Sequence, residues 1–64
     1  MKTFEVNEDA NYRIELLVGK EWKYITTEYS ISVASTVMIN IHNATKLKGR
    51  VLSIRSDNMV LSEI

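Results

Sequence analysis

The chain contains no cysteine and no proline, and only two glycines and one histidine among its 64 residues. A disulfide framework is therefore impossible, and a structural zinc site would lack the cysteine and histidine ligands that it needs. A core of this size rarely supplies more than about 3–5 kcal/mol, so natural domains this short often depend on a disulfide, a metal or another subunit. Without the first two, either the core packs unusually well or another chain completes it.

An excess of one charge and long apolar runs are also missing. Eight basic and eight acidic residues are scattered along the chain, which gives a formal net charge of zero. No strong field therefore directs the protein to nucleic acid or to an anionic membrane. The longest apolar runs, such as residues 16–18, are too short for a signal peptide or a membrane-spanning helix. We expect a cytoplasmic protein with no membrane partner, in which residues 1–64 form one domain.

Two stretches of the sequence have the pattern of β-hairpins. Before Gly19 the stretch YRIELLV alternates apolar and polar residues, and EWKYITT alternates again after it, so we predict a hairpin over residues 11–28. At the other end, RVLSIR and MVLSEI flank SDN, which predicts a second hairpin over residues 50–64 with a two-residue turn at Asp57-Asn58. Residues 1–10 are expected to form an arm or a short extra strand.

The length of the first loop decides which face each side chain occupies, since a one-residue slip moves every side chain to the opposite face. A two-residue loop would place Trp22 and Tyr24 beside Arg13 and Glu15, which mixes apolar and charged residues. A three-residue loop, Gly19 to Glu21, gathers the large apolar residues on one face. We therefore predict the three-residue loop, with both aromatic rings buried.

The segment SISVASTVMINIHNATK, residues 30–46, fits both a strand and a helix pattern. It has no turn signal although it is far longer than a typical strand of about 5–6 residues. Ser30 or Ser32 suits the N-cap of a helix, and Gly49 suits a left-handed C-cap. Seven β-branched residues lower its helix propensity, so a helix here must be stabilised by packing on a sheet. We predict a helix over residues 30–47.

Together these elements predict an α+β fold of ββαββ order, in which a four-stranded antiparallel sheet in the order 2-1-3-4 carries one helix on one face. The residues predicted to be buried on the sheet are Tyr12, Ile14, Leu16, Val18, Trp22, Tyr24, Leu52, Ile54, Met59 and Leu61. Those predicted to face them from the helix are Val33, Ala34, Val37, Met38 and Ile41.

No group of residues in the sequence is typical of catalysis, of a cofactor site or of a metal site. His42 has no cysteine or acidic residue at helical spacing and is expected to face solvent, and no glycine-rich phosphate loop is present. We predict a protein that is not an enzyme and has no catalytic, cofactor-binding or metal-binding residues. With the aromatic rings buried, the uncovered sheet face offers nucleic acid no stacking surface, so we rank nucleic-acid binding below protein binding.

The sheet face that the helix leaves uncovered is the predicted partner-binding surface, because it carries more apolar side chains than a monomer usually exposes. The predicted residues are Arg13, Leu17, Lys23, Ile25, Val51, Arg55, Val60 and Ile64. The expected partner is another protein, a second copy of the chain, or both. The alternative is that residues 1–10, with Phe4 and Val6, cover this face.

The succession YRIELLVGKEWKYI, an amphipathic segment and GRVLSIRSDNMVLSEI resembles the small ββαββ accessory proteins of bacteriophages. The resemblance spans residues 12–64 and rests on the order of the patterns, with no diagnostic motif. It implies a non-enzymatic viral protein that inhibits or redirects a host protein in the host cytoplasm. It assigns no site residues.

A second resemblance gives the alternative function, binding of RNA or DNA. VMINIHNATKLKGRVLSIRSDNMVL is similar to the strand-loop-strand of Sm-like RNA-binding barrels, with Gly49, Val51, Ile54 and Asn58 roughly at family positions. Asn58 falls about one residue early, Arg55 stands where the family usually has aspartate, and the preceding hairpin lacks glycine. This fold also requires residues 30–46 to be a strand.

Overall fold

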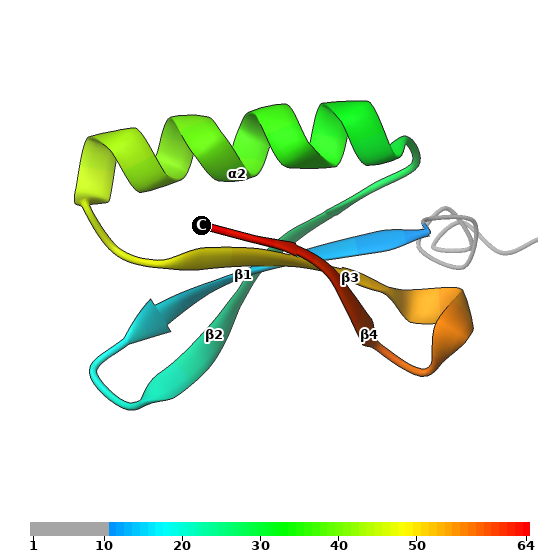
Figure 1. Cartoon of the computed structure of the whole chain (residues 1–64), viewed down its shortest axis with the longest axis horizontal. Coiled ribbons are helices and arrows are strands. Elements are labelled where there is room, and N and C mark those ends of the chain that lie inside the picture. Colours follow the sequence, from blue (N-terminus) through cyan, green and yellow to red (C-terminus); the bar gives the residue numbers. More distant parts are fainter. Residues whose placement is uncertain (1–10) are drawn as a thin grey trace, which may run out of the picture.

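The computed structural model describes residues 11–64 (Figure 1). Its elements in chain order are β1 (Tyr12–Val18), β2 (Glu21–Glu28), α2 (Ile31–Thr45), β3 (Gly49–Ser53), the short 3₁₀ helix η2 (Ile54–Ser56) and β4 (Met59–Glu63). The strands form one antiparallel sheet in the order β2-β1-β3-β4, and α2 lies across one face of it. The predicted fold class and strand order are thus confirmed. The arm or extra strand predicted at residues 1–10 lies outside the described residues.

Helix α2 occupies the segment whose pattern was ambiguous, so the strand that an Sm-like barrel requires there is not formed. Ser30 takes the N-cap position but makes no side-chain capping hydrogen bond. At the other end Lys46, at φ 65°, donates its N–H to the carbonyl of His42 at 2.6 Å, so the C-cap predicted at Gly49 is wrong. His42 is partly buried, and its Nδ1–H donates to the carbonyl of Leu47 at 2.7 Å.

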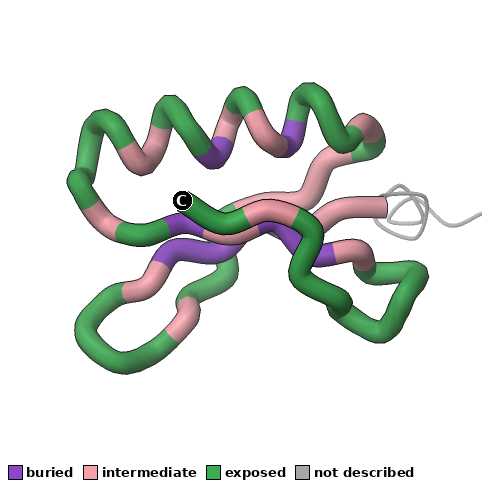
Figure 2. The backbone as a smooth tube through the Cα atoms, viewed as in Figure 1, coloured by how far each residue is buried: buried purple, intermediate pink, exposed green. Residues whose placement is uncertain are grey.

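The core lies between α2 and the two central strands. Figure 2 shows buried residues both on the helix and on the strands that face it. Its fully enclosed members are Ile14 and Val51 from the sheet and Ala34 and Met38 from the helix. Tyr12 and Val37 pack against them. Of the predicted helix residues, Ala34, Val37 and Met38 belong to the core, whereas Ile41 is only partly buried outside it and Val33 is 46% exposed. The helix therefore contacts the sheet through a narrower stripe than its sequence predicts.

Gly49 of β3 lies directly against a side chain of the helix. A Cβ atom at this residue would lie 2.8 Å from Cγ of Met38 and 3.4 Å from Cδ2 of Leu16. Met38 is itself buried, so it has little room to move away. Gly49 thus allows the Met38 side chain to rest directly on the backbone of β3.

The hairpin of β1 and β2 has a two-residue loop, Gly19-Lys20, so the predicted three-residue loop is wrong. Gly19 has φ 67°, a conformation that glycine adopts without strain. Farther along, Ile25 forms a β-bulge, beyond which Ile14 lies opposite Thr26, the pair that the longer loop predicts. The extra residue is therefore present, but in β2 rather than in the turn.

The position of this bulge reverses the faces of the two aromatic residues nearest the turn. Trp22 lies opposite Leu17 and Tyr24 lies opposite Glu15. Residues directly opposite one another in an antiparallel pair share a face, so both rings lie on the side away from α2. Their predicted burial under the helix is wrong, because the extra residue comes after them in the chain and not before them.

The hairpin of β3 and β4 turns through five residues, 54–58, instead of two. Asp57 and Asn58 are left-handed at φ 59° and 61°, and the N–H of Asn58 donates to the carbonyl of Ser53 at 2.8 Å. The turn lies where SDN predicts it. It is longer than predicted because a 3₁₀ turn precedes the left-handed pair.

Val51 and Leu52 occupy faces opposite to those predicted. Val51 lies opposite Ile14 and is enclosed beneath α2, whereas Leu52 lies opposite Arg13 on the other face. Both residues are apolar, so a period-two pattern fits either assignment equally well. The register of β1 against β3 decides between them.

Candidate contact surface on the uncovered sheet face

The sheet face away from α2 combines aromatic, aliphatic and charged side chains, and we call it the open face. Figure 1 shows the helix on the other side of the sheet only. Strand register and alternation place the following residues on the open face: Arg13, Glu15 and Leu17 of β1, Trp22, Tyr24 and Thr27 of β2, Arg50 and Leu52 of β3, and Val60 and Glu63 of β4.

Glu15 lies at the centre of the open face and joins two arginines. Its Oε1 accepts a hydrogen bond from Nε of Arg50 at 2.8 Å and lies 2.7 Å from Nη2 of the same residue. Its Oε2 lies 2.8 Å from Nε of Arg13. The Glu15 side chain is 9% exposed, against 39% for Arg13 and 23% for Arg50. The buried carboxylate is therefore neutralised, while both guanidinium groups still reach solvent.

Arg13 and Glu15 form an ion pair, but the angle at Nε of Arg13 does not fit a hydrogen bond. Nε of Arg13 is buried and makes no hydrogen bond within the part of the chain that the structure describes. An arginine carries five N–H donors, and one carboxylate shared with Arg50 cannot satisfy all of them. Arg13 therefore retains donor capacity, but because Nε is buried, an acceptor from another molecule can approach only the outer N–H groups of the guanidinium.

Each guanidinium also lies over an aromatic ring of β2. Cζ of Arg50 is 4.1 Å from the ring centroid of Trp22, and Cζ of Arg13 is 5.0 Å from that of Tyr24. Both distances lie within the roughly 6 Å range of cation–π attraction. These contacts exist because the bulge at Ile25 leaves both rings on the side of the arginines. We call Arg13, Glu15, Trp22, Tyr24 and Arg50 the arginine–aromatic cluster.

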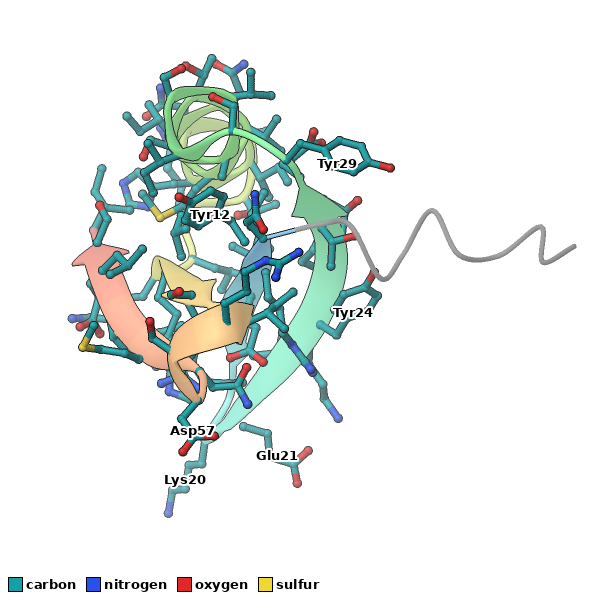
Figure 3. All side chains as sticks on the ribbon, turned by 90° about the vertical axis from the view of Figure 1, so that its right-hand side faces the viewer. Tyr12, Lys20, Glu21, Tyr24, Tyr29 and Asp57 are labelled. Carbon is teal, nitrogen blue, oxygen red and sulfur yellow. The ribbon has the colours of Figure 1, made fainter. Side chains whose placement is uncertain are left out.

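Figure 3 shows the difference between the tyrosines of the two sheet faces. Tyr12 points toward the helix, whereas Tyr24 lies on β2 well away from it. Tyr12 packs against the core, and Tyr24 is 52% exposed. One sheet face is thus closed by α2, and the other presents an aromatic ring to solvent.

Three of the predicted contact residues, Arg13, Leu17 and Val60, lie on the open face. The prediction is wrong for Val51, which is fully buried in the core because its register places it opposite Ile14.

The remaining predicted residues lie elsewhere. Lys23, opposite Leu16, and Ile64, which exchanges two backbone hydrogen bonds with Gly49, fall on the helix side of the sheet, so their predicted face is wrong. Ile25 is the extra residue of the bulge. Arg55 belongs to η2, and its Nε donates to Oδ1 of Asn11.

Most of the arginine–aromatic cluster was missed by the sequence prediction, although one local signal was available. Glycine followed by another residue is the usual sequence of a two-residue type II′ hairpin turn, and Gly19-Lys20 fits it. That turn places Trp22 and Tyr24 beside Arg13 and Glu15. The bulge that restores the apolar pairing farther along has no comparable sequence signal.

The two outer strands of the sheet are less suited to binding by strand addition. Both carry a bulge, at Ile25 in β2 and at Leu61 in β4. A bulge disrupts the ladder of backbone groups and is one of the ways in which proteins protect sheet edges. Three apolar side chains of β4 are nevertheless exposed, Met59 at 54%, Val60 at 42% and Leu61 at 43%. Contact through the face therefore fits this sheet better than contact through its edge.

Residues 11–64 form no pocket, and no three of their histidine or acidic side chains are grouped so that they could hold a metal ion. Within the same residues, no helix has the length and apolar character needed to cross a membrane. Comparisons with protein-family models, with curated proteins and with solved structures find no match to this chain.

Proposed function

We propose that this chain is a small non-enzymatic protein-binding module and that the open face is its contact surface. The arginine–aromatic cluster is the observation that supports this proposal. Tryptophan, tyrosine and arginine are the residue types most enriched among those that dominate binding energy at protein interfaces. Here they surround the centre of the face, with Leu17 and Val60 beside them, while Leu52 on the same face is only 4% exposed. This arrangement resembles an interface in composition and in layout.

The cluster is also ordered before any partner arrives. Arg13 and Arg50 are each held by the carboxylate of Glu15 and by an aromatic ring. Ordering a free, rotamer-rich side chain on binding costs about 0.5–1.5 kcal/mol. A partner that binds these two arginines avoids most of that cost, because they are already fixed. It also finds Glu15 already desolvated and neutralised.

The biological role in this proposal follows the resemblance to phage accessory proteins. The module would inhibit or redirect a host protein by covering part of its surface in the host cytoplasm. The order of elements supports this role, and the exposed aromatic and arginine side chains supply a contact for it. The proposal assigns no catalytic step and no cofactor.

Single-stranded nucleic acid is the second candidate ligand, and one observation favours it. Trp22 and Tyr24 lie on the open face, where bases could stack, which removes the reason for which the sequence ranked this function lower. Charge favours the protein ligand. Arg13 and Arg50 are balanced on this face by Glu15 and Glu63, whereas affinity for nucleic acid depends on an excess of positive charge at the phosphates.

Capture from cell lysate with two matched valine variants tests the proposal. Val60, on the open face, is 42% exposed, and Val33, on α2, is 46% exposed. We expect the parent chain and Val33→Lys to capture the same protein whether or not nuclease is added, and Val60→Lys to lose it. Capture that disappears with nuclease would favour the nucleic-acid candidate. Capture that Val60→Lys and Val33→Lys retain equally would contradict the role of the open face.

A further inference from the structure

We infer that the open face binds a second copy of this chain, so that two sheets pack face to face with the two helices outside. This inference rests on the proposed function, because it concerns the same surface: in the free protein the open face takes a second copy, and a host protein competes with that copy for it. Two sheets packed in this way lie about 10 Å apart, with their side chains interdigitated. The result is a four-layer dimer in which both faces of each sheet are covered.

The number of buried apolar side chains between residues 11 and 64 is small. Among the described residues, six apolar side chains are buried, of which Leu52 lies on the open face and not beneath the helix: Ile14, Leu16, Ala34, Met38, Val51 and Leu52. A domain this small usually needs further support, and this sequence has no cysteine for a disulfide. A second copy adds to the stability wherever the concentration of the chain exceeds the dissociation constant, whereas a different protein adds to it only where the two are produced together.

The charges of the open face are balanced, as contact with a second copy requires. In a two-fold contact the same patch meets itself, so its charges must match their own rotated copies. The open face carries two positive and two negative residues, Arg13 and Arg50 against Glu15 and Glu63. The net charge of the whole chain is also zero, so two copies do not repel one another.

Arg13 and Glu63 are the pair expected to meet across the two-fold axis. Arg13 is 39% exposed, and because its Nε is buried beside Glu15, the part of the side chain that a second copy can reach is its outer end. Glu63 is exposed and forms no ion pair within residues 11–64. An isologous dimer would make this contact twice, once on each side of the axis.

The area of the open face is just large enough for a dimer, and it limits the affinity. Four strands about 4.8 Å apart, each some six residues long at about 3.3 Å per residue, give a face of about 400 Å² in projection. Stable interfaces bury about 800 Å² of accessible surface on each partner. The dimer must therefore use the whole open face, including the cluster and β4. Interfaces of standard size have dissociation constants from micromolar to picomolar, and for a contact at the lower limit of area we expect the weak, micromolar end.

Sedimentation velocity over a concentration series that crosses the micromolar range tests the dimer. We expect the parent chain and Val33→Lys to pass from the mass of a monomer to that of a dimer, and Val60→Lys to remain a monomer. A second pair tests the charges: Glu63→Arg should raise the dimer dissociation constant about tenfold or more, whereas Glu21→Arg, at the hairpin tip, should not change it. Circular dichroism checks that each variant folds. If Val60→Lys does not fold, Glu63→Arg still tests the dimer.

Two results would overturn the inference. One is a parent chain that stays monomeric throughout the series, and the other is a dimer that survives both Val60→Lys and Glu63→Arg. If the chain is monomeric but captures another protein in a manner that Val60→Lys abolishes, the dimer is wrong and the proposed function stands. If Val60→Lys alters neither self-association nor capture, both fail.

Discussion

Replacing Gly49 by alanine measures how closely α2 is seated on the sheet. Where a site has room for it, glycine-to-alanine substitution stabilises a protein by about 0.4–1 kcal/mol, since alanine has fewer unfolded conformations to lose. Here the new Cβ would lie 2.8 Å from Cγ of Met38, well inside ordinary van der Waals contact. Met38 is only 2% exposed and cannot move into solvent. The substitution therefore forces either a strained rotamer or a shift of the helix.

Overfilling a packed core costs about 1–3 kcal/mol, so we expect Gly49→Ala to lower the free energy of unfolding by a net amount of about 1–2 kcal/mol. For a chain of this size, 1 kcal/mol corresponds to roughly 4–8 °C in the melting temperature, so the expected fall is about 5–15 °C. Thermal and urea unfolding measure the change. Gly49 lies in β3 and its φ is not left-handed, so the loss must come from packing.

A double-mutant cycle with Met38→Ala separates packing from backbone conformation. Truncating Met38 costs about 2–5 kcal/mol by itself, so the cycle is measured in a stabilising osmolyte. Met38→Ala also removes the clashing Cγ atom, so in this background Gly49→Ala should become stabilising. The expected interaction energy between the two sites is about 2 kcal/mol. Gly19→Ala is the control: Gly19 has φ 67° and open space around it, so we expect a similar loss of about 1 kcal/mol in both backgrounds.

The reasoning is refuted if Gly49→Ala is equally destabilising with and without Met38. That result would assign the cost to the backbone of Gly49, as expected of the left-handed C-cap that the sequence predicts. It is also refuted if Gly49→Ala stabilises the parent chain. In that case the helix would be free to lift from β3 without loss.

Two further substitutions test the cluster and the end of the helix. Glu15→Gln should lower the free energy of unfolding in urea by roughly 1–3 kcal/mol, because Arg13 and Arg50 lose the carboxylate that neutralises them. Glu21→Gln, which loses only an exposed ion pair with Lys23, should stay within about 0.5 kcal/mol, and equal effects would contradict a special role for Glu15. Lys46→Gly should raise the free energy of unfolding by about 0.5–1 kcal/mol, and with it the melting temperature, because glycine tolerates the left-handed φ of 65°. A lower melting temperature would show that the Lys46 side chain contributes more than its backbone costs.

The sequence determined the elements of this protein and their order in the sheet. Alternating patterns around Gly19 and around SDN predict two hairpins, and a long segment without a turn signal between them predicts the helix. A helix with seven β-branched residues needs a sheet to pack on, and the chain supplies one. Connection rules for crossovers then give the strand order, which the structure confirms. Each of these inferences depends on composition summed over many residues.

Only the tertiary structure decided which residues face the helix and which form the open face. That choice depends on single-residue shifts: a two-residue loop at Gly19, a bulge at Ile25 and another at Leu61. Each shift moves a set of side chains to the opposite face. The loop has a local signal in Gly19-Lys20, whereas the two bulges are settled by the packing of the whole sheet against α2. Val51 and Leu52 exchange roles for the same reason, because adjacent apolar residues are equivalent until a register is chosen. The aromatic rings predicted in the core therefore lie on the open face, beside the arginines that hold them.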